Sequence, residues 1–96
     1  MVDNIPFSRA KRNISRDFSD GLMMAELIYY YKPKLVSLHN YPAANSTNKK
    51  INNWNTLNDK VLKKLGIPIS KSHIHDIVNA VPQAIESYLY TVLIKL

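Results

Sequence analysis

Residues 46–66 read STNKKINNWNTLNDKVLKKLG, and this stretch decides the fold. Its large apolar side chains recur at intervals of three and four residues, which places them on one face of an α-helix. They are Ile51, Trp54, Leu57, Val61, Leu62 and Leu65, with Asn58 beside them. Ser46 or Thr47 can cap the start of this helix, and Gly66 suits the left-handed residue that commonly ends one. The stretch predicts a long helix whose tryptophan is a core anchor.

The chain before this stretch predicts a second helix and a covering segment. The helix begins at Ser19 or Asp20, either of which can cap its free N–H groups, and ends before Pro33. Its predicted apolar face consists of Met24, Leu27, Ile28 and Tyr31. Residues 32–47 then connect the two helices and are too apolar for a free loop. We expect this connector to lie over the core, in part as short helical turns. Its large apolar side chains are Leu35, Val36, Leu38 and Tyr41.

The chain after residue 66 predicts two shorter helices. The first runs from about Ser72 to Val81 and is started by Ser70 or Ser72. Its predicted inner face consists of Ile74, Ile77, Val78 and Val81. Pro82 is expected at the first position of the last helix, which continues to the end of the sequence. Its inward positions are Ile85, Leu89, Leu93 and Leu96. Strand signals are weak and no repeat occurs, so residues 1–96 predict one compact all-α domain of four to five helices.

The sequence is basic, and its excess charge lies in two blocks. Thirteen Lys and Arg against seven Asp and Glu give a net charge of +6. Residues 1–18 contain four basic and two acidic residues, residues 47–65 contain five and one, and the remainder balances. Such blocks favour an acidic partner: nucleic acid, an anionic membrane or an acidic protein surface. Solvated faces that contact nothing are the alternative.

Composition and motifs argue against several function classes. No cysteine is present, which excludes disulfides and thiolate chemistry. No glycine-rich phosphate loop or paired-carboxylate pattern occurs, so we expect no enzyme and no cofactor. His73 and His75 are two residues apart on a predicted helix and point to different faces, so we expect no metal site. No apolar run reaches the roughly 20 residues of a membrane span, and no signal peptide is evident. A cytoplasmic protein without a membrane partner is therefore expected.

Six tyrosines raise the question of nucleic-acid binding, because aromatic side chains can stack bases. Tyr29, Tyr30 and Tyr31 are consecutive and spread around a helix, and Tyr88 and Tyr90 diverge likewise. They cannot form one flat platform, and no helix-turn-helix motif is recognisable. We expect these tyrosines to pack in the core with exposed hydroxyls, and we expect no nucleic-acid partner.

Two sets of residues resemble a known family. Phe18-Ser19-Asp20-Gly21 begins a helix that closes at Lys32-Pro33, and a later helix combines Trp54 and Asn58 with Leu65-Gly66-Ile67. This arrangement resembles the calponin-homology domain. Most of the chain also resembles the sperm flagellar protein (CLAMP) branch of that family. The strings that carry this closer resemblance are Val2-Asp3-Asn4-Ile5-Pro6, Ser8-Arg9, Lys11-Arg12-Asn13, Ser15-Arg16-Asp17-Phe18, His39-Asn40-Tyr41 and Asn53-Trp54.

The resemblance implies a non-catalytic protein, without a metal, that binds, stabilises and bundles microtubules. It implies a place in the cytoskeleton of cilia and flagella, including the central pair (central apparatus) of motile axonemes. Tubulin and other axonemal proteins are the implied partners. The family has an amphipathic first helix with a tryptophan just before Val2, where this sequence has Met1. We therefore expect a truncated or nearly absent first helix. Because the family's downstream region is missing as well, we expect the sequence to be either a fragment or a shortened gene model.

The resemblance and the charge pattern together predict the side chains that face tubulin. In the first block they are Arg9, Lys11, Arg12 and Arg16, and in the second they are Lys49, Lys50, Lys60, Lys63 and Lys64. Arg16 is the first choice, because it directly precedes the helix start at residues 18–21. An internal ion pair with Asp17 or Asp20 is its alternative. A solvated face is the alternative for the second block.

Three further expectations concern structure and partners. Lys60 and Lys64 are expected to share one helix face at a spacing of four residues. Asn58 is expected to satisfy a buried backbone group in the connector. Actin, which many calponin-homology domains bind as tandem pairs, is the alternative partner, and a passive cytoskeletal adaptor is the other alternative function.

Overall fold

The computed structural model describes residues 13–96, and within this range it contains helices and no strand. The α-helices are α1 (Ile14–Asp17), α2 (Leu22–Tyr31), α3 (Thr47–Leu57), α4 (Lys71–Val78) and α5 (Ala84–Lys95). A π-helical segment, η3 (Asn58–Leu62), continues α3, and two 3-10 turns, η1 (Pro33–Leu35) and η2 (Leu38–Asn40), lie in the connector. The predicted all-α fold is confirmed. The expected loss of the first helix falls on residues 1–12, outside the described residues.

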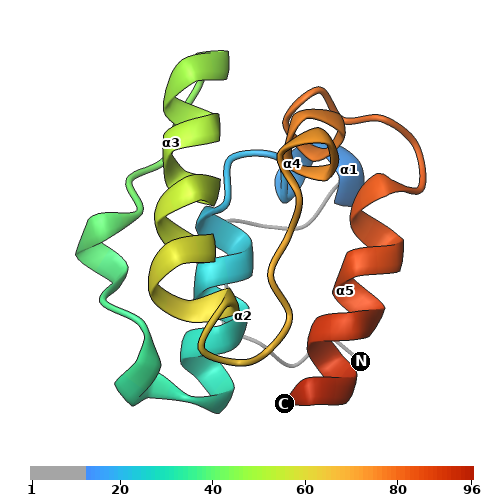
Figure 1. The fold of residues 1–96 in the computed structure, drawn as a ribbon. Coiled ribbons are helices and arrows are strands. Elements are labelled where there is room, and N and C mark those ends of the chain that lie inside the picture. Colours follow the sequence, from blue (N-terminus) through green and yellow to red (C-terminus); the bar gives the residue numbers. More distant parts are fainter. Residues whose placement is uncertain (1–12) are drawn as a thin grey trace.

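The helices surround one core that is centred on α3. Figure 1 shows α3 and α5 on opposite sides of the molecule, with α4 crossing between them at one end and in contact with both. Trp54 is fully buried, and its Nε1 donates a hydrogen bond of 3.0 Å to the Ser19 carbonyl oxygen. Its ring also packs edge-on against Tyr88 of α5, at 6.5 Å between ring centroids. The predicted anchor role of Trp54 is confirmed. No helix in residues 13–96 is long and apolar enough to cross a membrane.

The turn before α2 is tied to α3 and to the connector by two buried polar side chains. The Asp20 carboxylate accepts hydrogen bonds from the Leu22 N–H at 3.0 Å and from the Ala44 N–H at 3.3 Å. Asn53 of α3 donates to the Asp20 and Pro42 carbonyl oxygens, at 2.9 and 2.8 Å. The predicted helix start at Ser19 or Asp20 is wrong, because Gly21, with a φ of 81°, is the N-cap and α2 begins at Leu22. Asp20 still satisfies a free N–H group of the first turn, that of Leu22, as expected.

The connector lies over the core as predicted. Helix α2 ends at Tyr31, directly before the Lys32-Pro33 pair, and the two 3-10 turns follow. Val36 and Tyr41 are buried, whereas Leu35 remains exposed. Burial raises the pKa of Tyr41 above its ordinary value. The connector is thus an ordered wall beside α3.

The predicted regular helix over residues 46–66 is wrong at its second half. Ser46 caps α3 as expected, by accepting the Lys49 N–H at 3.3 Å. After Leu57 the backbone widens to a π-helical turn, in which the Lys63 N–H bonds to the Asn58 carbonyl oxygen at 3.0 Å. The chain then ends the helix at Gly66, whose φ of 78° is the predicted left-handed conformation.

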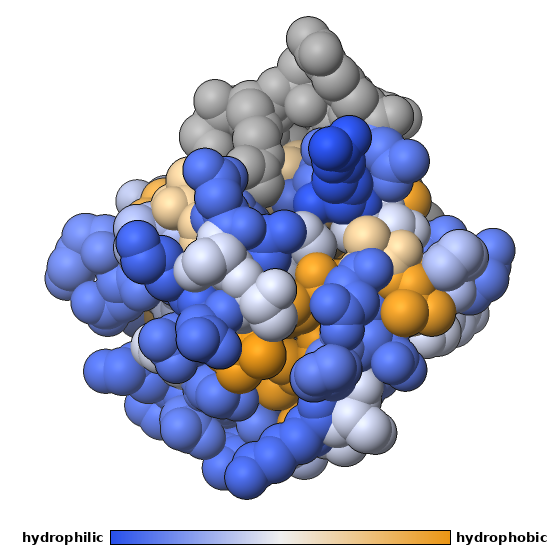
Figure 2. All heavy atoms as spheres, turned by 90° about the horizontal axis from the view of Figure 1, so that it is seen from above, coloured by the Kyte–Doolittle hydropathy of each residue, from blue (hydrophilic) through white to orange (hydrophobic). Residues whose placement is uncertain are grey.

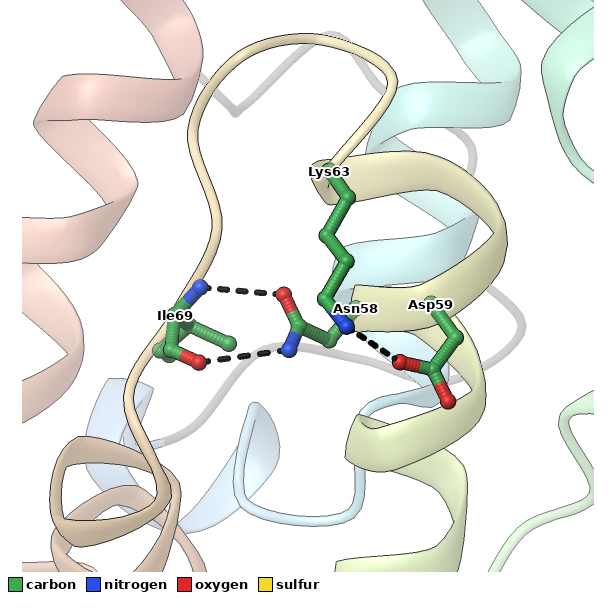
Figure 3. A network of polar contacts seen from close by, with 4 residues as sticks. All are labelled: Asn58, Asp59, Lys63 and Ile69. Atoms are coloured by element: carbon green, nitrogen blue, oxygen red, sulfur yellow. Dashed lines mark hydrogen bonds and ion pairs between the residues drawn. The ribbon is translucent and has the colours of Figure 1, made fainter.

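The side chain of Asn58 explains where this turn is placed. Figure 3 shows its carboxamide facing Ile69, with Oδ1 accepting the Ile69 N–H at 3.0 Å and Nδ2 donating to the Ile69 carbonyl oxygen at 3.3 Å. Asn58 therefore satisfies the backbone groups of Ile69. The prediction that it satisfies a backbone group in the connector is wrong. Asn53 bonds to the connector instead.

The predicted start of α4 is confirmed, whereas the boundaries predicted at Val81 and Pro82 are wrong. Of the two predicted caps Ser70 is the one used, accepting the His73 N–H at 3.1 Å, and Ser72 lies inside α4. The helix stops at Val78 because Ala80 takes a φ of 55° and the Val81 N–H reaches back to the Asp76 carbonyl oxygen at 2.9 Å. Val81 is therefore exposed. Pro82 lies in the turn that follows, and α5 begins only at Ala84, after Gln83 with a φ of 73°.

The tyrosines divide into exposed and buried side chains. Tyr29, Tyr30 and Tyr31 are each more than two-fifths exposed, and Tyr90 is 63% exposed. The predicted core packing of these four, and the inward position of Tyr31, are wrong, because only the opposite side of each helix meets the core. Tyr88 is buried, and its hydroxyl donates to the Ile67 carbonyl oxygen instead of facing water. Burial raises the pKa of Tyr88.

Candidate functional site

Arg16 is presented on a fixed backbone. Its N–H donates to the Asn13 side chain at 3.1 Å, and its carbonyl oxygen accepts the Ser19 hydroxyl at 2.7 Å. The neighbouring Phe18 is fully buried and anchors the turn. The side chain of Arg16 is exposed, and within residues 13–96 its guanidinium group makes no ion pair. The alternative of an internal pair with Asp17 or Asp20 is therefore absent from this structure. The other predicted residues of this block, Arg9, Lys11 and Arg12, lie outside the described residues.

The five predicted lysines of the second block do not form one patch. Lys49 and Lys50 lie in the first turns of α3, whereas Lys60, Lys63 and Lys64 follow its end. A rise of 1.5 Å per residue separates positions 49 and 60 by about 16 Å along the helix axis. The molecule thus carries a first basic patch, Lys49 and Lys50, and a second basic patch, Lys60, Lys63 and Lys64.

The second basic patch is shaped by the π-helical turn. Lys60 and Lys64 are both exposed. On a regular helix a spacing of four residues would place them on one face, and the wider π-helical turn at residues 58–62 changes that alignment. Lys63 forms an ion pair with Asp59 at 3.0 Å, drawn in Figure 3. Both side chains are more than half exposed, so this pair contributes little to stability.

Lys95 of α5 extends the second basic patch and was missed in the sequence. Its Nζ lies 3.8 Å from the position that a Cβ on Gly66 would occupy. The side chain therefore reaches the turn that closes η3. The two residues are 29 positions apart in the chain, and the packing of α5 beside this turn brings them together. Lys95 lies outside residues 47–65, so the charge count of that block did not include it.

The two histidines of α4 each have a hydrogen-bond partner within the fold. His73 Nε2 lies 2.8 Å from the Ala84 carbonyl oxygen, and its ring packs edge-on against Tyr88. His75 Nδ1 lies 3.0 Å from Asn79 Nδ2. Among the residues that the structure describes, no three His, Cys, Asp or Glu side chains gather as metal ligands would. The histidines connect helices and helix ends.

Two hollows flank α3. One has a volume of about 400 Å³ and lies between the connector and the face of α3 that carries Lys49 and Asn53. The other, about 220 Å³, lies between α3 and α4 and has Ile51 and Ile74 among its lining residues. Figure 2 looks onto this end of the molecule and shows a small hydrophobic area bordered by hydrophilic side chains. The described surface thus offers basic side chains and shallow hollows, which suits the binding of a partner.

The fold and the exposed cations are those of a helical binding domain, and sequence comparison identifies the class. The family model described as a CH-like domain in sperm protein matches residues 1–94, and the chain belongs to this family. The resemblance to the calponin-homology domain is thereby confirmed.

The curated relatives are proteins named Sperm flagellar protein 1. The chain is 52% identical to the one from Xenopus laevis over 95 residues, which cover 99% of this chain and 42% of that protein. It is 50% identical to the one from Homo sapiens over 88 residues, which cover 92% of this chain and 37% of that protein. The corresponding identity with the Mus musculus protein is 51%, over 38% of its length. The chain therefore spans about two-fifths of the length of these relatives.

Proposed function

We propose that this chain is a non-catalytic module that binds microtubules through exposed basic side chains. The observation that carries the proposal is the membership of residues 1–94 in a family of sperm proteins, combined with a net charge of +6. The name of the relatives associates them with the sperm flagellum. A flagellar cytoskeletal role is the coarse form of the proposal. Tubulin as the partner and the central pair of the axoneme as the place are its finer form.

Arg16 is the residue proposed to make the central contact. Its backbone is fixed at both the N–H and the carbonyl oxygen, while its guanidinium group is free of ion pairs within residues 13–96. Because the backbone is already ordered, binding has only the side chain left to fix, and a guanidinium can pair with a carboxylate through two hydrogen bonds. We propose that Arg9, Lys11 and Arg12 contribute to the same contact.

The first basic patch, at the start of α3, and the second basic patch, after its end, are proposed as additional contacts. Because they are about 16 Å apart along the helix, they reach different points of a partner surface. Contacts of this kind stabilise a polymer when both points lie on adjacent subunits. Bundling requires a second microtubule, and we propose that it depends on self-association beyond this domain.

Co-sedimentation with stabilised microtubules over a salt series tests the proposal, with filamentous actin in parallel. We expect salt-sensitive pelleting with microtubules and at least about a tenfold loss of affinity in Arg16→Ala, the scale of one hydrogen bond to a charged group. Lys34→Ala is the matched control, since Lys34 is an exposed cation of η1 outside the proposed set. Equal losses in both variants would contradict a specific role of Arg16. Pelleting with actin alone would identify an actin-binding domain, and pelleting with neither would leave an adaptor.

A further inference from the structure

The larger hollow, of about 400 Å³, has two rigid walls of different kinds. One wall is the connector at residues 40–44, which Figure 1 shows running alongside α3. The other is formed by Lys49, Asn52, Asn53 and Thr56 of α3. These four positions are spaced by three, one and three residues, so they share one helix face. Among residues 13–96, no acidic side chain lines the hollow, and the cation Lys49 does.

The connector wall is preformed. The Pro42 carbonyl oxygen accepts the Asn53 carboxamide at 2.8 Å, and the Ala44 N–H donates to the Asp20 carboxylate at 3.3 Å. Both anchoring side chains are buried, with exposed fractions of 5% for Asn53 and 1% for Asp20. A ligand would therefore enter a site whose walls are already ordered, and it would lose little affinity to reorganisation.

Asn53 leaves an unused acceptor in this site. Its Nδ2 donates to two carbonyl oxygens, those of Asp20 and Pro42, and these acceptors fix the orientation of the amide. Within residues 13–96, no group donates to its Oδ1. Asn53 is 95% buried and lines the hollow, and its Oδ1 is not among the fully buried atoms without a partner, so this oxygen is open to the hollow. A ligand with an N–H group would donate to it in place of water.

The same chain shows how its asparagines recognise a peptide bond. Asn58 bonds with its carboxamide to both the N–H and the carbonyl oxygen of Ile69, at 3.0 and 3.3 Å. Ile69 belongs to an extended segment without helical structure of its own. In the hollow, Asn40 and Asn52 are exposed carboxamides with the same capacity, and neither has a partner within residues 13–96. A peptide in extended conformation offers alternating N–H and carbonyl groups that match these side chains.

We infer that this hollow binds a short extended peptide that carries a carboxylate. A backbone N–H of the peptide donates to Asn53 Oδ1, Asn52 bonds to a neighbouring peptide group, and Lys49 pairs with the carboxylate. The charge of the hollow selects acidic peptides, and the asparagines select extended backbone over other anions. This site does not depend on the proposed contact of Arg16 with microtubules, because its ligand is a single peptide free in solution.

Titration of the ¹⁵N-labelled 96-residue chain with an acetylated octapeptide of alternating glutamate and glycine tests the inference. We expect chemical-shift changes confined to residues 40–44 and 49–56, including the side-chain amide signals of Asn52 and Asn53. A peptide whose glycine nitrogens are methylated keeps the charge but loses backbone N–H donors. We expect it to bind about five- to tenfold more weakly, the scale of one lost hydrogen bond to a polar partner.

Variants locate the contact. Asn52→Ala and Lys49→Ala are each expected to weaken binding by about fivefold or more, since each removes one polar contact. Asn48→Ala and Lys64→Ala are matched controls, because both residues are exposed and lie outside the hollow. Shift changes centred on residues 60–64, equal binding of the methylated peptide, or no shift changes at millimolar peptide would each overturn the inference.

Discussion

The two ends of α3 use the same residue type in different ways. Near the start of the helix, Asn53 donates both protons of its carboxamide to backbone oxygens and leaves its oxygen without a donor among residues 13–96. Near the end, Asn58 satisfies both the donor and the acceptor side of its carboxamide on Ile69. The first arrangement leaves capacity for a ligand, and the second is complete within the fold. The comparison teaches that a buried asparagine indicates function only when part of its hydrogen-bonding capacity remains unused.

The lysines at the two ends of α3 also differ, in whether they form an ion pair within the described part of the chain. Lys49 lies beside the hollow and forms no ion pair within residues 13–96. Lys63, at the other end, is paired with Asp59 at 3.0 Å. The start of α3 thus combines an unpaired cation with an unused acceptor. The end of α3 combines a π-helical turn, an ion pair and a left-handed glycine, all of which shape the chain itself.

The largest effect is expected from Asn53→Leu, which keeps the volume but removes the amide. It removes the hydrogen bonds to the Asp20 and Pro42 carbonyl oxygens, the first of them buried, and we expect a loss of about 2–4 kcal/mol in the free energy of unfolding. Urea denaturation followed by circular dichroism measures this loss. Asn48→Leu, an exposed substitution in the first turn of α3, is expected to change stability by less than about 0.5 kcal/mol. A similar loss in both variants would contradict the structural role of Asn53.

Asn58→Leu is expected to have a smaller effect on stability and a visible effect on geometry. Ile69 is buried but the bonds to it are only partly so, and we expect a loss of about 1–2 kcal/mol. Because the carboxamide draws the backbone toward Ile69, its removal should also allow residues 58–62 to return to regular α-helix. Backbone NOE contacts and amide hydrogen exchange would show the change. A π-helical turn that persists in Asn58→Leu would separate the turn from this side chain.

Tyr88→Phe tests the other side chain that ties the segment after Gly66. The hydroxyl of Tyr88 donates to the Ile67 carbonyl oxygen, and we expect its removal to cost about 1 kcal/mol at neutral pH. Burial raises the pKa of Tyr88 above its ordinary value of 10.0. Above pH 10 the unfolded chain releases this proton while the folded chain retains it, so the contribution to stability falls as pH rises.

The pH dependence gives this prediction its control. At about 1.4 kcal/mol per pH unit, the advantage of the unchanged chain over Tyr88→Phe should vanish by about pH 11. Lysine deprotonation affects both chains alike and cancels in the difference. Denaturation curves at pH 8, 10 and 11 make the comparison. A constant difference across this range would mean that Tyr88 ionises in the folded chain as readily as in the unfolded one.

Local signals in the sequence predicted most of the fold. Ser46, Ser70 and Asp20 each accept an N–H of the helix that follows, and Gly66 has the expected positive φ. These features depend on neighbours within a few residues, so spacing and residue type suffice to find them. The π-helical turn depends on Asn58 meeting Ile69, eleven positions away, and no periodicity contains that contact. The left-handed Ala80 and Gln83 carry side chains that rarely adopt this conformation, which is why the end of α4 was misplaced.

The candidate site could be predicted only in part. Charge blocks identified exposed cations such as Arg16 and Lys49, because lysine and arginine remain at the surface almost regardless of fold. They could not show that Lys95 reaches Gly66, which depends on the packing of α5. The unused oxygen of Asn53 could not be predicted either, because it depends on two hydrogen bonds from the Asn53 side chain to residues 33 and 11 positions away.

Lys63→Ala is expected to have a small effect on stability, and its comparison with Lys64→Ala tests the second basic patch. An exposed pair with Asp59 at a spacing of four residues contributes about 0.3–0.5 kcal/mol, so denaturation should shift only slightly. Lys64, also exposed, makes no ion pair within residues 13–96, and Lys64→Ala should leave stability unchanged. Microtubule affinity should show the reverse order, because Lys63 must share its charge with Asp59 while Lys64 offers its charge entirely to the partner. Co-sedimentation at low salt compares the two variants directly. If Lys63→Ala weakened binding more than Lys64→Ala, the expected order of affinities would be contradicted. The ion pair between Lys63 and Asp59 would then have to break on binding.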